Sequence, residues 1–377
     1  MQTYLAVLGR LPALSLAELE RQFSHVRQLS STLATFDSAT PPDLSRLGGS
    51  LKLAEKLDSS PLDYLKSLPE GKITLGISDF SRGASRRTAT LEALKLKKIL
   101  SRLSRSVRVL ENRDAVLSTA TSHHNQLSEK RNHVELIKFN HDWYRVLAVQ
   151  NITAYAHRDR VRPARDARVG MLPPKLAQIL INLCGPLSAR KILLDPFCGT
   201  GVVLQEALLS GFSVLGSDLE PRMVEYTKKN LDWLKAQPLL TFPPDCDIID
   251  ICVGDATVFD WQNVAPYLSA VACETYLGSP LSAPPSELKL QSEKQTCRTI
   301  ILGFLENLAP QLAKDTPVVL AVPAWLRPSG RYSRLNLLDD IANLGYNVVK
   351  LETSTGPLLY YREGQIVPRE IIILRKP

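Results

Sequence analysis

The chain has 377 residues, of which 44% are hydrophobic and 22% are charged. This length allows two or three domains with sizeable cores, and the composition excludes wholesale disorder. The net charge of +8 is uneven, because residues 1–170 carry 27 basic and 17 acidic side chains while the remainder carries 19 and 21. The positive first half favours a polyanionic partner, and its alternative is chance clustering on a solvated surface.

The cysteines indicate whether the protein holds a metal or disulfides, and the apolar runs indicate whether it contacts a membrane. Six cysteines all lie in the second half without a CxxC pair, so we expect no metal site and no disulfide framework. The start, MQTYLAVLGR, lacks the basic and long apolar regions of a signal peptide. Because no apolar run reaches the ~20 residues of a membrane span, we expect a cytoplasmic protein without membrane contact.

Hydrophobic periodicity in the first half predicts alternating strands and helices. The first strand leads into an amphipathic helix, for which Ser15 and Glu18 would form a capping box. A strand, a basic helix, a strand and a hairpin that turns at 140–142 follow. The predicted elements span residues 3–9, 14–23, 73–80, 91–103, 107–112, 133–139 and 143–150.

A break in composition separates the two halves. Residues 156–174 hold five Arg, two Asp and three Pro without an apolar period, which predicts an extended linker that ends where Pro173 and Pro174 open a helix. From there, apolar strands alternate with amphipathic helices, as in a mostly parallel sheet covered on both faces. The last two strands, 346–352 and 369–376, indicate a closing hairpin with one antiparallel member.

The most specific local motif is Asp-Pro-Phe-Cys-Gly-Thr-Gly at 195–201, between a predicted strand and a predicted helix. Glycines at such a turn let a ligand approach the backbone at the carboxyl edge of the sheet. The motif is neither GxGxxG nor a P-loop, and its acidic first residue suits a ligand with a positive charge beside a nucleoside. Asp218 and Asp255 end the next two strands, although Asp also ends strands for purely structural reasons.

The DPFCGTG loop resembles that of S-adenosylmethionine-dependent methyltransferases that act on exocyclic amino groups of nucleic-acid bases. The start YLAVLGRLPALSLAELE, the segment RPARDARVGMLPPKLAQILINL and the end YYREGQIVPREIIIL are similar to the THUMP-domain tRNA guanosine-N2 methyltransferases that modify position 10. This resemblance covers the whole chain. It implies a ferredoxin-like segment at 1–70, a THUMP-like α+β RNA-binding domain at 71–155, a linker at 156–172 and a Rossmann-like α/β class I methyltransferase domain with a mostly parallel seven-stranded sheet at 173–377.

The same resemblance implies S-adenosylmethionine as cofactor and tRNA as partner, and it leaves room for a small activating protein subunit. The methionine half of the cofactor would lie on the Gly-rich loop, its ribose on the second strand end and its adenine after the third. The cofactor-binding residues are then Asp195, Pro196, Phe197, Gly199, Gly201, Asp218, Asp255 and Ala256.

After the fourth strand, amino-group methyltransferases usually carry an Asp/Asn-Pro-Pro-aromatic loop. The Asp or Asn oxygen of this loop accepts hydrogen bonds from the amino N–H groups, and the aromatic ring stacks on the flipped-out base. Here the strand is followed by Glu274-Thr275-Tyr276-Leu277-Gly278, without either proline and with the aromatic one place early. We expect Glu274 as the acceptor and Tyr276 as the stacking ring, since the later Ala283-Pro284-Pro285-Ser286 has no acid.

Basic residues are dense between positions 82 and 108, where nine Lys or Arg are opposed only by Glu92. This density favours RNA phosphate contact over an ordinary solvated helix face. Arg165 of the linker could contact cofactor or RNA, or form a structural salt bridge. The expected substrate contacts are Arg82, Arg86, Arg87, Lys97, Lys98 and Arg165.

Together these features predict an RNA methyltransferase that transfers a methyl group in line to the N2 amino group of a flipped-out tRNA guanosine at position 10. Two alternatives remain open. A tRNA-binding protein with a degenerate or altered methyltransferase site would explain the unusual loop after the fourth strand. A DNA amino-methyltransferase would share the cofactor loop but would not explain the THUMP-like half.

Overall fold

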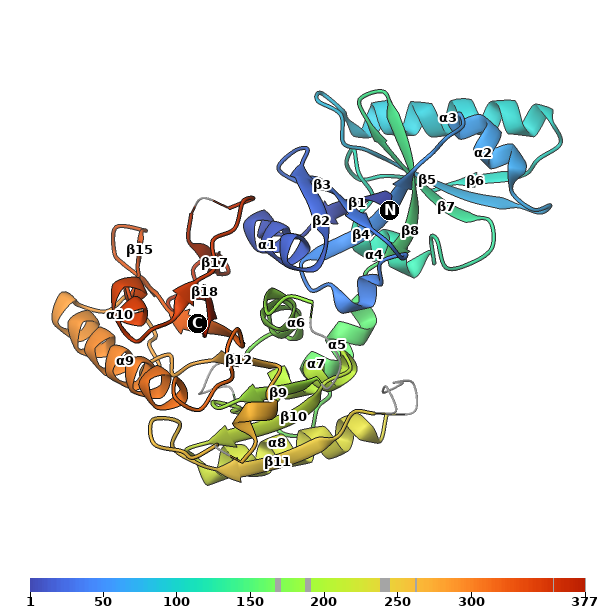
Figure 1. Ribbon diagram of the computed structural model, residues 1–377. Helices are drawn as coiled ribbons and strands as arrows, with labels where there is room; N and C mark the ends of the chain where they lie inside the picture. The colour runs from blue at the N-terminus through green and yellow to red at the C-terminus, as the bar shows by residue number, and fades with distance from the viewer. Residues whose placement is uncertain (167–170, 187–190, 238–244, 262, 355, 377) are drawn as a thin grey trace. The chain divides into compact units, whose positions relative to one another are not determined.

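The computed structural model describes residues 1–166, 171–186, 191–237, 245–261, 263–354 and 356–376. The chain divides into two compact units, Met1–Leu19 with Phe23–Tyr155 and Glu20–Gln22 with Ala156–Pro377 (Figure 1). Within the described ranges, none of the helices has both the length and the apolar character that a membrane span requires.

The first unit is built on one eight-stranded sheet in the order β2-β3-β1-β4-β8-β7-β5-β6. Most neighbouring strands are antiparallel, but β5 runs parallel to both β6 and β7. This one sheet runs through both the expected 1–70 and 71–155 segments. Its strands are β1 (Gln2–Leu8), β2 (Ser24–Gln28), β3 (Leu33–Ser38), β4 (Ser50–Lys56), β5 (Ile73–Asp79), β6 (Val107–Val109), β7 (His133–Phe139) and β8 (Asp142–Val149).

Helix α3 (Arg86–Arg102) packs on this sheet through one apolar face. Ala89, Ala93, Leu96 and Leu100 recur at helical spacing and are buried against the strands β5 and β6. The opposite face of α3 carries basic residues, so the predicted basic helix is present and is amphipathic. The other helices of this part are α1 (Pro12–Gln22), η1 (Leu44–Arg46), α2 (Pro61–Ser67), α4 (Thr119–His124) and α5 (Ile152–Arg160).

The prediction that Ser15 and Glu18 form a capping box at the start of the first helix is wrong. Helix α1 begins at Pro12, three residues before Ser15, and its N-cap Leu11 makes no side-chain cap. Ser15 is buried and donates to the Gly49 carbonyl at 2.6 Å, while Glu18 accepts from the Gly48 and Gly49 amides at 2.8 Å each. Both side chains therefore satisfy a buried loop instead of the helix end.

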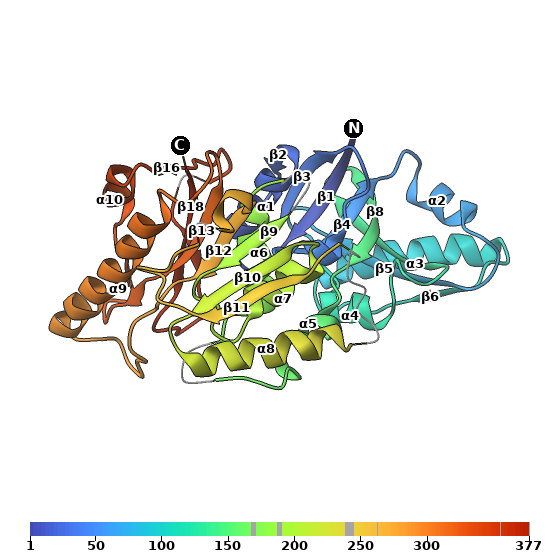
Figure 2. The ribbon, with the colours of Figure 1, turned by 60° about the horizontal axis from the view of Figure 1, so that its bottom comes forward.

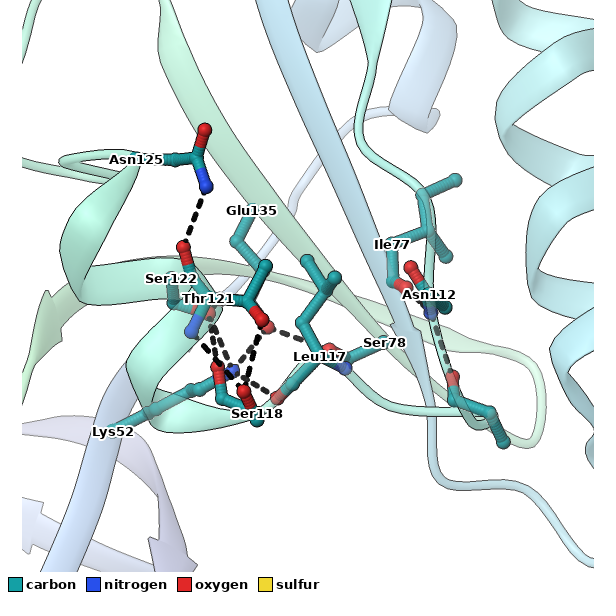
Figure 3. Close-up of polar contacts among 11 residues, drawn as sticks. Lys52, Ile77, Ser78, Asn112, Leu117, Ser118, Thr121, Ser122, Asn125 and Glu135 are labelled. Carbon is teal, nitrogen blue, oxygen red and sulfur yellow. Dashed lines mark hydrogen bonds and ion pairs between the residues drawn. The ribbon is translucent and has the colours of Figure 1, made fainter.

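A buried polar network joins β4, β5, β7, α4 and the segment before α4 (Figure 3). The Lys52 ammonium donates to Glu135 at 2.5 Å, and to the Ser122 hydroxyl and the Leu117 carbonyl at 2.9 Å each. Glu135 also accepts from Ser78 at 2.6 Å and from Ser122 at 2.7 Å. Since Lys52 is 2% exposed and Glu135 is 0% exposed, this ion pair is shielded from solvent.

The second unit contains a sheet in the order β11-β10-β9-β12-β13-β18-β16, with β17 paired to β18. The first five strands are parallel, and β18 runs antiparallel to both β13 and β16. The predicted mostly parallel sheet with seven main strands is confirmed. Its strands are β9 (Ile192–Asp195), β10 (Ser213–Asp218), β11 (Ile248–Val253), β12 (Ala270–Glu274), β13 (Pro317–Pro323), β16 (Asn347–Val348), β17 (Leu358–Tyr360) and β18 (Arg369–Arg375), beside the small pair β14 (Trp325–Leu326) and β15 (Tyr332–Ser333).

Helices cover this sheet (Figure 2). Ile301, Phe304 and Leu305 of α9 lie in one core with apolar residues of β9, β12 and β13. Helices α7 and α8 contact β9, β10 and β11, and α6 contacts α7. The helices are α6 (Pro174–Leu183), α7 (Val202–Leu209), α8 (Pro221–Lys235), η2 (Ala265–Tyr267), α9 (Glu287–Leu308) and α10 (Leu338–Asn343).

The segment expected to be an extended linker is structured in its first part. Helix α5 continues to Arg160, and Arg158 makes two hydrogen bonds, of 2.6 and 3.1 Å, to the buried Glu206 of α7. Ala164 exchanges two backbone hydrogen bonds of 2.9 Å with the Asn230 side chain. Composition did not reveal these contacts, because its Arg-rich character resembles that of a solvated linker; residues 167–170 lie outside the described part.

Candidate active site at the carboxyl edge of the second sheet

The order of the second sheet reverses between β9 and β12, because β10 and β11 lie on one side of β9 while β12 and β13 lie on the other. In open α/β sheets, a ligand binds outside the carboxyl ends of the strands at such a reversal. Asp195, Asp218 and Glu274 are the last residues of β9, β10 and β12. The structure therefore places three of the predicted acids at this edge.

The Gly-rich loop between β9 and α7 depends on its glycines. Gly201 has a φ of +79°, and a Cβ there would lie 2.9 Å from the Thr227 Cγ2 atom. Gly199 has a φ of +53° and donates its amide to Asp218 at 2.8 Å. A side chain at Gly201 would be both strained and obstructed, so the loop can follow this tight path only with glycine there.

Asp195 is 2% exposed, and one of its oxygens accepts from the Phe197 amide at 3.2 Å. Burial raises the pKa of Asp195 well above its ordinary value, and the nearby charges of Asp218 and Glu274 raise it further. A carboxylate in this setting is stabilised when a cation lies beside it. Phe197 itself packs edge-on against Phe304 of α9, with ring centroids 5.2 Å apart.

Asp218 organises the loop in a way that the sequence did not reveal. Its two oxygens accept from the amides of Gly199 at 2.8 Å and Glu220 at 3.0 Å. Burial raises the pKa of Asp218, and these two amides partly oppose that shift. Each carboxylate oxygen can accept a second hydrogen bond, so the same group can shape the loop and receive a ligand hydroxyl.

Asp255 follows β11 and is exposed, whereas its neighbour Ala256 is buried. One oxygen of Asp255 accepts from both the amide and the hydroxyl of Thr257, at 2.9 and 2.8 Å. The Gly254 amide donates to the Asp218 carbonyl at 3.0 Å. This bond places the end of β11 beside the end of β10.

The loop after β12 is held at both ends. Thr275 donates its amide to the Ala321 carbonyl at 3.1 Å. Ser279 donates its amide and hydroxyl to Glu293 of α9, at 2.9 and 2.7 Å. Tyr276, between these anchors, is 40% exposed, which leaves its ring accessible to a flat ligand.

Glu274 forms an ion pair that sequence reasoning missed. Its Oε1 lies 2.7 Å from the Nε of Arg369, the first residue of β18, and the two side chains are 15% and 8% exposed. Arg369 and Glu293 are 95 and 19 residues away from Glu274 in sequence. The only available signal for Arg369 was its place in the C-terminal segment that carried the family resemblance.

The basic residues of the first unit were expected to face solvent. Arg82, Arg86, Arg87, Lys97 and Lys98 are all exposed, and Arg86 lies 4.0 Å from Glu111. A different neighbour, Arg105, donates to the carbonyls of Leu68 and Pro69, so this member of the basic cluster has a structural role. Arg165, in the second unit, is exposed.

These features give the second unit a doubly wound, Rossmann-like α/β fold. Residues 162–243 match the family model described as the RMKL-like methyltransferase domain, so this segment is similar to such domains.

Curated relatives match parts of the chain. The tRNA (guanine(10)-N2)-dimethyltransferase of Methanothermobacter thermautotrophicus is 52% identical over 157 residues, which cover 42% of this chain and 40% of that protein. The protein of the same name from Pyrococcus abyssi is 33% identical over 113 residues, 30% of each chain. These matches span less than half the length of either relative. The crystal structure of TrmN from Thermus thermophilus aligns over 100% of both chains, with a TM-score of 0.49 and 18% identity.

Proposed function

We propose that this protein is an S-adenosylmethionine-dependent methyltransferase that acts on the N2 amino group of a tRNA guanosine, with position 10 as the target. The observation that carries the proposal is the set of acids at the sheet reversal, where the buried Asp195 favours a cation and Glu274 offers an acceptor. The relatives that share up to 52% identity with parts of this chain are named for this reaction. Action on tRNA would place the protein in the cytoplasm.

The residues at the edge fit the cofactor, because a buried carboxylate of raised pKa suits a positively charged ligand. The cofactor supplies a methyl group on a positively charged sulfur. Asp195 and the backbone of Gly199 and Gly201 would hold its amino-acid half, while Asp218 and Asp255 would accept from its ribose and adenine. Pro196, Phe197 and Ala256 complete the set by shaping these two turns.

In this mechanism Glu274 and Tyr276 act on the base. The lone pair of an exocyclic amino group is delocalised into the ring, so the nitrogen is a poor nucleophile. Glu274 accepts a hydrogen bond from an amino N–H and so orients the nitrogen lone pair toward the methyl group. Tyr276 stacks on the base after the base has left the RNA helix. Both residues orient the substrate for a direct in-line transfer.

Binding of the tRNA is assigned to the exposed basic residues. Arg82, Arg86, Arg87, Lys97 and Lys98 lie on and before α3, where they would contact phosphates by charge rather than by sequence. Arg165 would add a contact from the second unit.

Methyl transfer from labelled cofactor to unmodified tRNA transcripts tests the proposed reaction. We expect transfer by the natural protein, loss of transfer in Glu274→Ala and loss of cofactor binding in Asp218→Ala. Asp232→Ala, which removes an exposed acid of α8, is the matched control. It should keep both methyl transfer and cofactor binding. Cofactor and tRNA binding without transfer to any tRNA would instead support a binding protein with an altered site, and transfer to DNA alone would support the DNA alternative.

Salt dependence tests the binding surface. Joint replacement of Arg86, Arg87, Lys97 and Lys98 by Gln should weaken tRNA binding and reduce the slope of log affinity against log salt by roughly 0.7–0.9 for each lost phosphate contact. Lys56→Gln with Lys66→Gln is the control, because these lysines are already paired with Asp142 and Asp63. An unchanged slope would remove α3 from the proposed tRNA surface.

A further inference from the structure

The ion pair between Glu274 and Arg369 is made possible by the one long antiparallel strand of the second sheet. Strand β18 begins where the parallel strands end, because Arg369 pairs with Pro323, the last residue of β13. From this position the Arg369 side chain reaches across β13 to Glu274 on β12. Its Nη1 also donates to the Val367 carbonyl at 3.2 Å, so the guanidinium is held at two points.

This pairing determines what Glu274 can offer to a substrate. Arg369 donates to Oε1, and among the described residues no hydrogen bond reaches Oε2. Because Arg369 fixes Oε1, the second oxygen is the atom that Glu274 can offer to a ligand. An ionised carboxylate carries no proton to donate, so this oxygen serves as a hydrogen-bond acceptor.

Bases that carry an amino group differ in the atom beside it. In guanine the N2 amino group lies next to the N1–H, so two donors point in the same direction. In adenine and cytosine the amino group lies next to a ring nitrogen with a lone pair. A carboxylate accepts from both donors of guanine, whereas it repels the lone pair of the other two bases.

We infer that Arg369 and Glu274 together form a specificity device that selects a base with a ring N–H beside its amino group, which among the standard amino bases is guanine. Arg369 is a positioning residue and Glu274 reads the base. This inference rests on the proposed function, because it assigns a second task to the same acceptor.

The test uses tRNA in which 2-aminopurine replaces the target guanosine. This base keeps the 2-amino group but has a lone pair at N1 and lacks the O6 of guanine, so the comparison between the natural protein and the Glu274 variant isolates the contribution of N1–H. We expect the natural protein to methylate guanosine about 10- to 100-fold faster than 2-aminopurine under single-turnover conditions. In Glu274→Gln the preference should fall or reverse, because the amide can donate to N1.

Variants of the arginine separate positioning from general damage. Arg369→Met should lower the guanosine preference toward one, and Arg369→Lys should restore part of it. Arg334→Met is the matched control, because Arg334 bonds to Glu370, the neighbour of Arg369, at 2.7 Å instead of to Glu274. It should keep the natural preference, and cofactor affinity measured by calorimetry checks that each variant is folded.

The outcomes distinguish this inference from the proposed function. If the natural protein methylates guanosine but Glu274→Gln keeps the full preference, the specificity device is refuted and the methyltransferase remains. The same conclusion follows if Arg334→Met lowers the preference as much as Arg369→Met does. If the natural protein methylates no tRNA, the proposed function fails, and this inference fails with it.

Discussion

Replacing Lys52 by Met should strongly destabilise the first unit, because it leaves a buried charge without its partner. Lys52 is 2% exposed and makes three hydrogen bonds, and Glu135, at 0% exposure, would keep only Ser78 and Ser122 as donors (Figure 3). Removing one member of a buried ion pair costs about 3–5 kcal/mol. That is a large part of the ~5–15 kcal/mol by which a protein is stable.

The pair can be separated from its surroundings by a second change. In Lys52→Met with Glu135→Gln the orphaned charge is gone, while the amide oxygen can still accept from one of the two serines and the amide NH2 can donate to the hydroxyl of the other. We expect the double variant to regain about half or more of the lost free energy of unfolding, since the main cost is the unpaired charge rather than the lost contact.

Hydrogen exchange of the full chain in increasing denaturant, read by mass spectrometry on peptides of β4, β5, β7 and α4, measures this effect within the first unit. Lys56→Met is the control, because Lys56 lies at the end of the same strand but forms an exposed pair with Asp142. Equal, small effects for Lys52→Met and Lys56→Met would refute the argument from buried charge. A double variant as unstable as the single variant would show that packing, not charge, carries the cost.

Three further predictions concern the second unit. Burial raises the pKa of Asp195, so the folded protein loses stability as pH rises from about 4, where the unfolded chain begins to release this proton. Asp195→Asn should therefore raise the melting temperature of the cofactor-free protein at pH 7 but not at pH 4. The same variant should bind the cofactor more weakly, and thermal melts with and without cofactor product measure both effects. Gly201→Ala should destabilise by about 1–3 kcal/mol in denaturant titrations and abolish cofactor binding, because its φ is +79° and its Cβ would meet Thr227. Glu293→Gln should lower kcat while cofactor affinity in calorimetry stays unchanged, since Glu293 holds Ser279 beyond the acceptor loop; an unchanged kcat would contradict this role.

The features that could be predicted from sequence are those with a local pattern. The strand that ends at Asp195, its Gly-rich turn and the following helix are contiguous, so spacing alone places them together. Asp218 and Asp255 follow because consecutive parallel strands end at one edge. The mostly parallel character of the sheet also follows from the regular alternation of apolar strands and helices.

The features that sequence reasoning missed depend on contacts between distant segments. Ser15 and Glu18 have the spacing of a capping box, but burial against the Gly48–Gly49 turn decides their hydrogen bonds. Arg369 reaches Glu274 only because β18 enters the sheet antiparallel beside β13. No local spacing encodes such a pairing, since it depends on where a whole strand inserts.

The three acids that end β9, β10 and β12 differ in their electrostatic surroundings. Arg369 compensates Glu274, and two amides compensate Asp218. Asp195 is the most buried of the three, and its side chain accepts from the Phe197 amide at the longer distance of 3.2 Å. A cation at this edge would therefore be stabilised most beside Asp195, while Glu274 is the acid held by an arginine. Under the proposed function, the charged cofactor and the amino group of the substrate would then occupy different positions along one row of strand ends.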